Sequence, residues 1–132
     1  MTNVESATPW HSSSELGSAH GSNADFKFQV SSMKITQAIL DKLTAEAKAS
    51  PRLRMNMDLR NGASDQSQRM LNAIEPGSVL PIHRHQKTSE TVVCLRGRLV
   101  WEFYDELERI CTERVELSPG GPVVALNVPI GQ

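Results

Sequence analysis

The sequence predicts a mainly β protein, an antiparallel sandwich or barrel of short strands preceded by one helix. From residue 69 onward, short runs rich in β-branched and aromatic residues alternate with turns that contain proline, glycine or charged residues. Residues 35–49 instead carry an apolar side chain at every fourth position, which is the helical pattern. The length of 132 residues suits one domain with a hydrophobic core.

Residues 1–32 are predicted to be a flexible tail or leader, and residues 33–132 the domain. The first 32 residues include eight serines and few aliphatic side chains, so they have little apolar surface to bury. They have neither the basic start nor the apolar stretch of a secretory signal. Because Met33 directly follows this segment, it is an alternative natural start of the protein.

The helix over 35–49 carries its apolar side chains on one face, at Ile35, Ile39, Leu43 and Ala47. Ser50-Pro51 ends it, because the residue before a proline avoids the α region. A polar, turn-rich connector is expected over 51–68.

The strands are expected in chain order between recognisable turns, Pro76-Gly77 and Pro119-Gly120-Gly121 among them. In the fourth strand, Leu99, Trp101 and Phe103 alternate onto one face. The six predicted strands are Arg69–Glu75, Ser78–Ile82, Thr91–Leu95, Leu99–Tyr104, Ile110–Leu117 and Val123–Val128.

His83, His85 and Glu90 form the clearest candidate for a chemical site. Residues i and i+2 of a strand face the same side, so the two imidazoles can converge, and Glu90 opens the next predicted strand. Two histidines and a carboxylate suit a divalent first-row metal, whether iron, manganese, zinc or nickel. The alternative is a pair of solvated loop histidines.

The histidines belong to a longer run, Gly77-x5-His83-x-His85-x4-Glu90-x6-Gly97. This run resembles the first motif of the cupin superfamily at every defined position. The resemblance implies a cupin-like antiparallel β-barrel, or double-stranded β-helix, with a metal held inside by His83, His85 and Glu90.

Further segments narrow the resemblance to the WbuC-type cupin-fold metalloproteins. These segments are the helix 35–49, the run Ser50-Pro51-Arg52-Leu53-Arg54-Met55-Asn56, residues 68–73 and Glu75-Pro76-Gly77. The similarity extends from Met33 to about Gly131. It implies a role in surface-polysaccharide metabolism, without a defined reaction, and a homodimer as the expected assembly.

The C-terminus departs from the cupin pattern. The second cupin motif, Gly-x5-Pro-x-Gly-x2-His-x3-Asn, is matched in its middle by Pro129-Ile130-Gly131. Seven residues, instead of five, separate its glycine, Gly121, from Pro129, and its histidine would lie two positions beyond Gln132. We therefore expect a barrel that is incomplete at its C-terminal end.

Four further residues are weaker ligand-binding candidates. Arg52, Arg54 and Asn56 could bind a phosphate or sugar carboxylate, because guanidinium groups pair with such anions bidentately; the alternative is a solvated connector. Cys94 shares a strand face with Glu90 and would line the cavity, unless it is a buried structural cysteine.

Arg84 alternates with the histidines and is expected on the outside of the barrel. Trp101, Phe103 and Tyr104 are expected in the core, with a sugar-stacking platform as the alternative.

Composition excludes several function classes. The net charge of −1 gives no basic footprint for nucleic acid, and the longest apolar run has only four residues, Val123–Leu126, which is too short to span a membrane. Two cysteines form no disulfide framework and favour the cytoplasm.

Three functions stay open. One is an enzyme of isomerase, epimerase or oxygenase type, in which a divalent metal acts on a small sugar-derived or oxygenated ligand. The second is a non-catalytic binding or regulatory module, and the third is an inactive fragment. No residue beyond the three ligands stands out as a general base.

Overall fold

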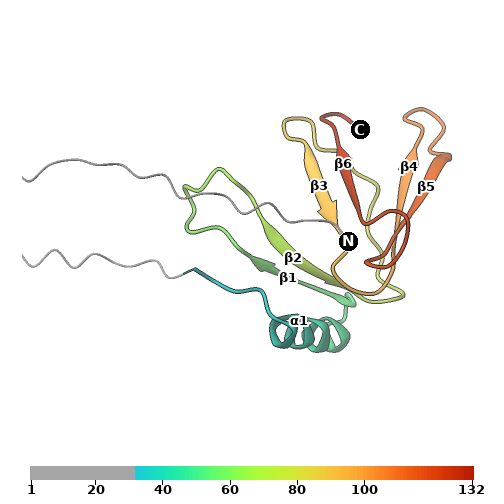
Figure 1. Cartoon of the computed structure of the whole chain (residues 1–132). Coiled ribbons are helices and arrows are strands. Elements are labelled where there is room, and N and C mark those ends of the chain that lie inside the picture. Colours follow the sequence, from blue (N-terminus) through green and yellow to red (C-terminus); the bar gives the residue numbers. More distant parts are fainter. Residues whose placement is uncertain (1–31) are drawn as a thin grey trace, which may run out of the picture. The chain divides into compact units, whose positions relative to one another are not determined.

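One helix and six strands make up the described part of the chain, residues 32–132 of a computed structural model (Figure 1). All but the last residue of the predicted tail 1–32 lie outside the described residues, as do His11 and His20. The elements are α1 (Gln37–Ala49), β1 (Arg54–Asp58), β2 (Met70–Ile74), β3 (Glu90–Val93), β4 (Leu99–Tyr104), β5 (Cys111–Leu117) and β6 (Ala125–Val128).

Helix α1 packs on the antiparallel sheet formed by β1 and β2, as Figure 1 shows. Its apolar stripe is confirmed at Leu43 and Ala47, which are buried, and Ile39 is half-buried. Ile35 instead precedes the helix and is 48% exposed, so that part of the stripe is wrong. Leu71 is also buried and lies opposite Met57 in the register, so this sheet face carries the apolar residues. The helix begins two residues later than predicted, because the Thr36 hydroxyl caps it by accepting from the Ile39 N–H.

Strands β4 and β5 form a second antiparallel sheet, and β3 pairs with β6 in a third. The β3–β6 pairing brackets the β4–β5 hairpin in sequence. Two backbone hydrogen bonds join the segments around them, from Cys94 N–H to the Val124 carbonyl at 2.9 Å and from Ser118 N–H to the Val123 carbonyl at 3.0 Å. Cys94, Leu117 and Val128 are the buried residues of this region.

The mainly β prediction is confirmed, but the strands do not close a barrel within residues 32–132. The predicted strand Ser78–Ile82 is wrong. This segment is held by hydrogen bonds from side chains and not by pairing with another strand. The Arg54 guanidinium donates to the Val79 carbonyl at 2.9 Å, and the Ser78 hydroxyl donates to the Arg52 carbonyl at 3.1 Å. Pro81 has no N–H to donate to a ladder.

Strand β1 lies within the predicted connector 51–68, so that part of the prediction is wrong. The strand is hard to recognise from the sequence, because Arg54, Asn56 and Asp58 are polar or charged and only Met55 and Met57 between them are apolar. Pairing with β2 nevertheless buries part of this alternate face against α1.

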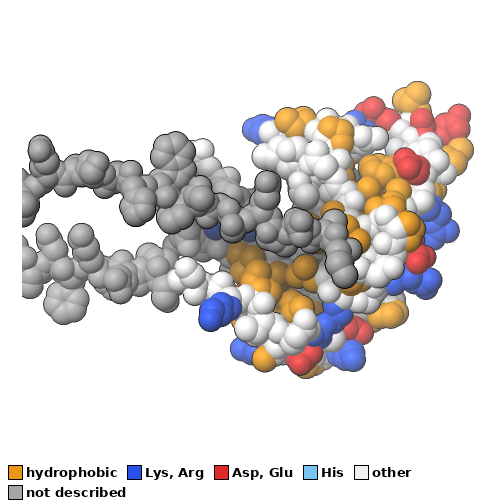
Figure 2. All heavy atoms as spheres, in the orientation of Figure 1, with side chains coloured by type: hydrophobic (Ala, Val, Ile, Leu, Met, Phe, Trp, Pro, Cys, Tyr) orange, Lys and Arg blue, Asp and Glu red, His pale blue; other side chains and the backbone are white. Residues whose placement is uncertain are grey.

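Many large apolar side chains are exposed among the described residues, including Val79, which is 83% exposed, and Leu80, Ile82 and Val124. Figure 2 shows apolar side chains at the surface over the β1–β2 sheet and beside β4 and β6. No helix within the described residues is long and apolar enough to cross a lipid bilayer.

Candidate functional site

His83 and His85 lie in the irregular segment between β2 and β3, not on a strand as predicted. Their ring centroids are nevertheless 5.3 Å apart, with the ring planes inclined by 76°. His83 Nδ1 lies 2.9 Å from the Pro81 carbonyl oxygen. Because a carbonyl only accepts, this contact selects the tautomer with the proton on Nδ1 and leaves the lone pair on Nε2.

Glu90 is the first residue of β3 and lies opposite Val128 of β6. Its half-buried carboxylate approaches the imidazole of His85, with 3.4 Å between Oε2 and Nε2. The His85 carbonyl in turn accepts from the Gly131 N–H at 2.9 Å, so the segment after β6 lies beside the histidines. Figure 1 shows the chain before β3 and the chain after β6 meeting at the same end of this sheet.

The three predicted ligands are therefore neighbours. Two imidazole nitrogens and one carboxylate form a donor set that fits a divalent metal, and the contact between His83 and Pro81 is of the kind that orients ligating histidines. Within residues 32–132, however, no three His, Cys, Asp or Glu side chains are already arranged to hold an ion.

Arg84 lies between the two histidines in the sequence, and its side chain contacts a different partner. Its guanidinium pairs with Glu106 in the turn between β4 and β5, at 3.3 Å. Sequence reasoning missed Glu106, because nothing in the order of residues places that turn beside the histidines.

The three candidate anion ligands, Arg52, Arg54 and Asn56, differ in their local surroundings. Arg54 and Asn56 alternate onto the sheet face opposite Met55 and Met57, and Arg54 already donates to the Val79 carbonyl. Arg52 lies two residues before Arg54, the first residue of β1. The φ of +54° at Leu53 between them interrupts the strand alternation that would place Arg52 on the same face as Arg54 and Asn56.

Cys94 is buried, and its thiol donates to the carbonyls of Arg96 and Gly97 at 3.4 and 3.9 Å. These contacts favour the structural alternative over a cavity ligand. Both cysteines of the chain are free thiols.

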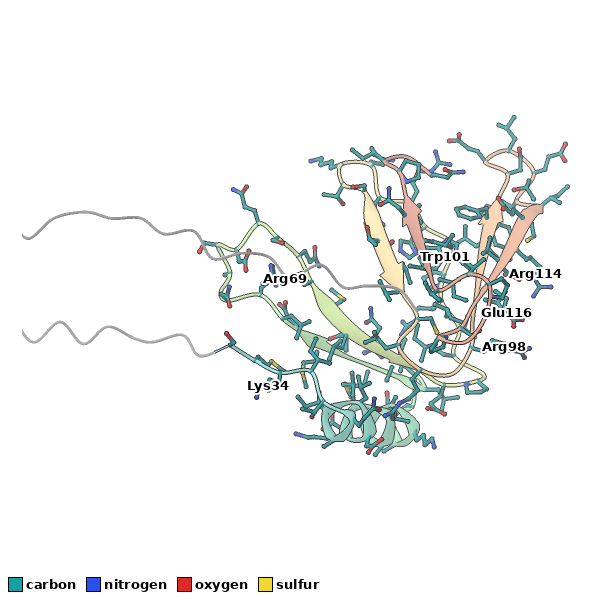
Figure 3. The ribbon with its side chains drawn as sticks, in the orientation of Figure 1. Lys34, Arg69, Arg98, Trp101, Arg114 and Glu116 are labelled. Carbon is teal, nitrogen blue, oxygen red and sulfur yellow. The ribbon has the colours of Figure 1, made fainter. Side chains whose placement is uncertain are left out.

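The aromatic residues of β4 are half-buried instead of fully enclosed. Trp101 lies opposite Val115, on the face away from the ion pair of Arg114 with Glu102. Figure 3 shows Arg98, Arg114 and Glu116 along one side of this sheet and Trp101 on the other.

Tyr104 follows the irregularity in the β4–β5 register, and its hydroxyl donates to Glu102 Oε2 at 2.8 Å. This hydrogen bond raises the pKa of the Tyr104 phenol above its usual value, with desolvation and the Glu102 charge adding to the effect. A phenol whose proton is held in this way is a poor general base.

Comparison with known proteins identifies one family, described as a domain of unknown function (DUF6016), whose sequence profile matches residues 35–117. The match spans α1 to β5 and includes His83, His85 and Glu90. No curated protein and no solved structure matches the chain. Since the profile covers more than half of the sequence, the chain belongs to the DUF6016 family.

Proposed function

We propose that this chain is a cupin-type metal-binding domain, related to the WbuC type, which binds one divalent ion through His83, His85 and Glu90. The observation that carries the proposal is the meeting of these three side chains from two separate segments, with 5.3 Å between the rings and 3.4 Å between His85 and Glu90. A bound divalent ion would supply Lewis-acid chemistry to an oxygenated ligand.

The proposed ligand is a small sugar-derived or oxygenated molecule, and the proposed setting is surface-polysaccharide metabolism in the cytoplasm. The composition supports a small-molecule partner rather than nucleic acid, because the net charge is −1. The pairing of the chain into a homodimer is part of the same proposal.

Metal titration tests the proposal. The wild type should bind about one Mn²⁺ or Zn²⁺ per chain, and H83A/H85A should lose this site while keeping the circular dichroism spectrum of the folded protein. The variant H11A/H20A removes as many histidines outside the motif and serves as the matched control. Equal binding by the two double variants would refute the assignment of the ligands.

A non-catalytic binding module is the second candidate. It is favoured because other side chains that could act in catalysis already make hydrogen bonds within the protein. The Tyr104 hydroxyl is hydrogen-bonded to Glu102, the Cys94 thiol is bonded to backbone carbonyls, and Arg54 is bonded to Val79. Turnover of sugar nucleotides that depends on added Fe²⁺ or Mn²⁺ would favour the enzyme. Binding of the same compounds without turnover would favour the module.

A further inference from the structure

An ion pair connects the segment that carries the two candidate histidines with the turn between β4 and β5. Arg84, which lies between His83 and His85, reaches Glu106 in the turn between β4 and β5, with 3.3 Å between Nη1 and Oε1. The Arg84 side chain is 36% exposed and that of Glu106 is 72% exposed. The pair therefore joins segments that are more than twenty residues apart in the sequence.

The turn that presents Glu106 is held by its own hydrogen bonds. Asp105 Oδ1 accepts from the backbone N–H groups of Leu107 and Glu108, both at 2.8 Å, and the Asp105 N–H donates to the Ile110 carbonyl at 2.8 Å. Glu106 thus offers its carboxylate from a fixed backbone, which makes it a useful anchor for a neighbouring loop.

The histidine segment has few other supports. It is not part of a strand, both histidines are exposed, and its backbone is tied to the chain after β6 through the His85 carbonyl and the Gly131 N–H. The His85 side chain also contacts Glu90. The pairing of Arg84 with Glu106 supplies a further attachment to a different element, made through the side chain that lies between the two candidate ligands.

We propose that Glu106 acts through Arg84 as a positioning residue for the metal-binding histidines. The inference rests on the proposed function. Attachment at both Gly131 and Glu106 limits the conformations of residues 83–85 before the ion arrives. Less conformational freedom is then lost on binding, so the affinity for the ion is higher.

Simple electrostatics makes a different prediction from positioning. If the two charges acted only through their fields, removing the positive charge of Arg84 would strengthen cation binding and removing the negative charge of Glu106 would weaken it. If the pair positions the loop, both substitutions weaken binding, because each one breaks the same attachment.

The experiment measures Mn²⁺ affinity from the free-ion paramagnetic resonance signal in wild type, R84Q, E106Q and R84Q/E106Q. Positioning predicts that all three variants bind more weakly by a similar factor, up to about fivefold, which corresponds to ~1 kcal/mol for an exposed pair. The double variant should be no weaker than either single variant, since the attachment can be lost only once.

The matched control is E116Q, which breaks the pair of Arg98 and Glu116 on the side of the β4–β5 sheet marked in Figure 3. That pair has a similar separation, 3.4 Å, with 69% and 55% exposure, and E116Q should leave Mn²⁺ affinity within twofold of wild type. Stronger binding by R84Q, or a double variant that matches wild type, would overturn positioning in favour of plain electrostatics.

Failure of the proposed function has a separate signature. If wild type binds neither Mn²⁺ nor Zn²⁺, both the metal site and its positioning by Glu106 are refuted. If wild type binds and H83A/H85A does not, while E106Q binds as well as E116Q, the metal site stands and the positioning role is refuted.

Discussion

Replacement of Gly77 by alanine should destabilise the fold more than replacement of another turn glycine. Gly77 has a φ of +91°, and a Cβ atom added to it would lie 3.3 Å from Leu53 Cδ1. A side chain in the left-handed region costs about 1–2 kcal/mol. The tight approach to Leu53 adds up to about 1 kcal/mol, because that side chain must shift within its half-buried site.

Two other glycines allow the cost of the backbone conformation to be measured apart from the cost of the contact with Leu53. Gly97 has a φ of +69° but open space around the position of an added Cβ, so G97A should cost about 1–2 kcal/mol through its backbone alone. Gly62 has neither feature, so G62A should lie within about 0.5 kcal/mol of wild type or be slightly more stable. The expected order of stability is therefore G62A, then G97A, then G77A, which should lose up to about 3 kcal/mol in total.

Urea unfolding followed by circular dichroism measures the order. With a slope of about 1–3 kcal/mol per molar urea, G77A should lower the midpoint by about 1 M or more. Equal midpoints for G77A and G97A would show that the contact with Leu53 costs nothing. Equal midpoints for all three variants would refute the backbone reasoning as well.

Three more predictions concern packing, titration and the attachment of the helix. Leu117 is fully buried, so L117A should lose about 2–5 kcal/mol in urea unfolding, whereas V79A at an exposed position should lose little. The chain has a single tyrosine, so the phenolate absorbance reports Tyr104 alone; its pKa should lie above 10, and E102Q should lower it. Since the pKa of Tyr104 is raised in the folded state, its hydrogen bond to Glu102 stabilises the fold below pH 10, and this stabilisation is lost as the pH rises through the folded pKa. An unchanged Tyr104 titration in E102Q would contradict Glu102 as the cause of the raised pKa. Arg96 bonds Asp41 at 2.7 Å and also Gln37, so R96K should cost up to about 1 kcal/mol in the same unfolding assay, and no change would show that a point charge suffices.

The sequence predicted the helix and most strands because their burial is one-sided. Leu43 and Ala47 recur at helical spacing and are the buried positions of α1, and the alternation of β4 places Leu99 and Trp101 on its half-buried face. Boundaries moved by one or two residues, as at the Thr36 cap of α1.

Two elements were mispredicted because their partners decide their structure. β1 is a strand because β2 pairs with it, although three of its five residues are polar or charged. Ser78–Ile82 has the apolar content of a strand, but its carbonyl at Val79 is satisfied by the Arg54 side chain, and no ladder forms. Neither the pairing of β1 with β2 nor the hydrogen bond from Arg54 to Val79 can be read from the local composition of these segments.

The sequence predicted that His83, His85 and Glu90 lie near one another, but not the geometry of the segment that carries them. His83, His85 and Glu90 meet as expected, although the histidines lie outside any strand, so the argument from strand alternation gave the wrong reason. Glu106 could not be predicted, since its approach to Arg84 depends on how the β4–β5 hairpin lies against the histidine segment. Metal binding itself stays a prediction.

The hydrogen bond from Gly131 to His85 has a consequence for the order in which the domain assembles. β1 pairs with β2, and β4 with β5, across short stretches of chain, but β3 must wait for β6, which is synthesised after the whole β4–β5 hairpin. Pairings between distant segments form more slowly than local ones, because more chain entropy is lost in closing the loop. We therefore expect the surroundings of His85 to be completed after the β1–β2 and β4–β5 pairs, once Gly131 has left the ribosome, and the histidines to be without these neighbours until then.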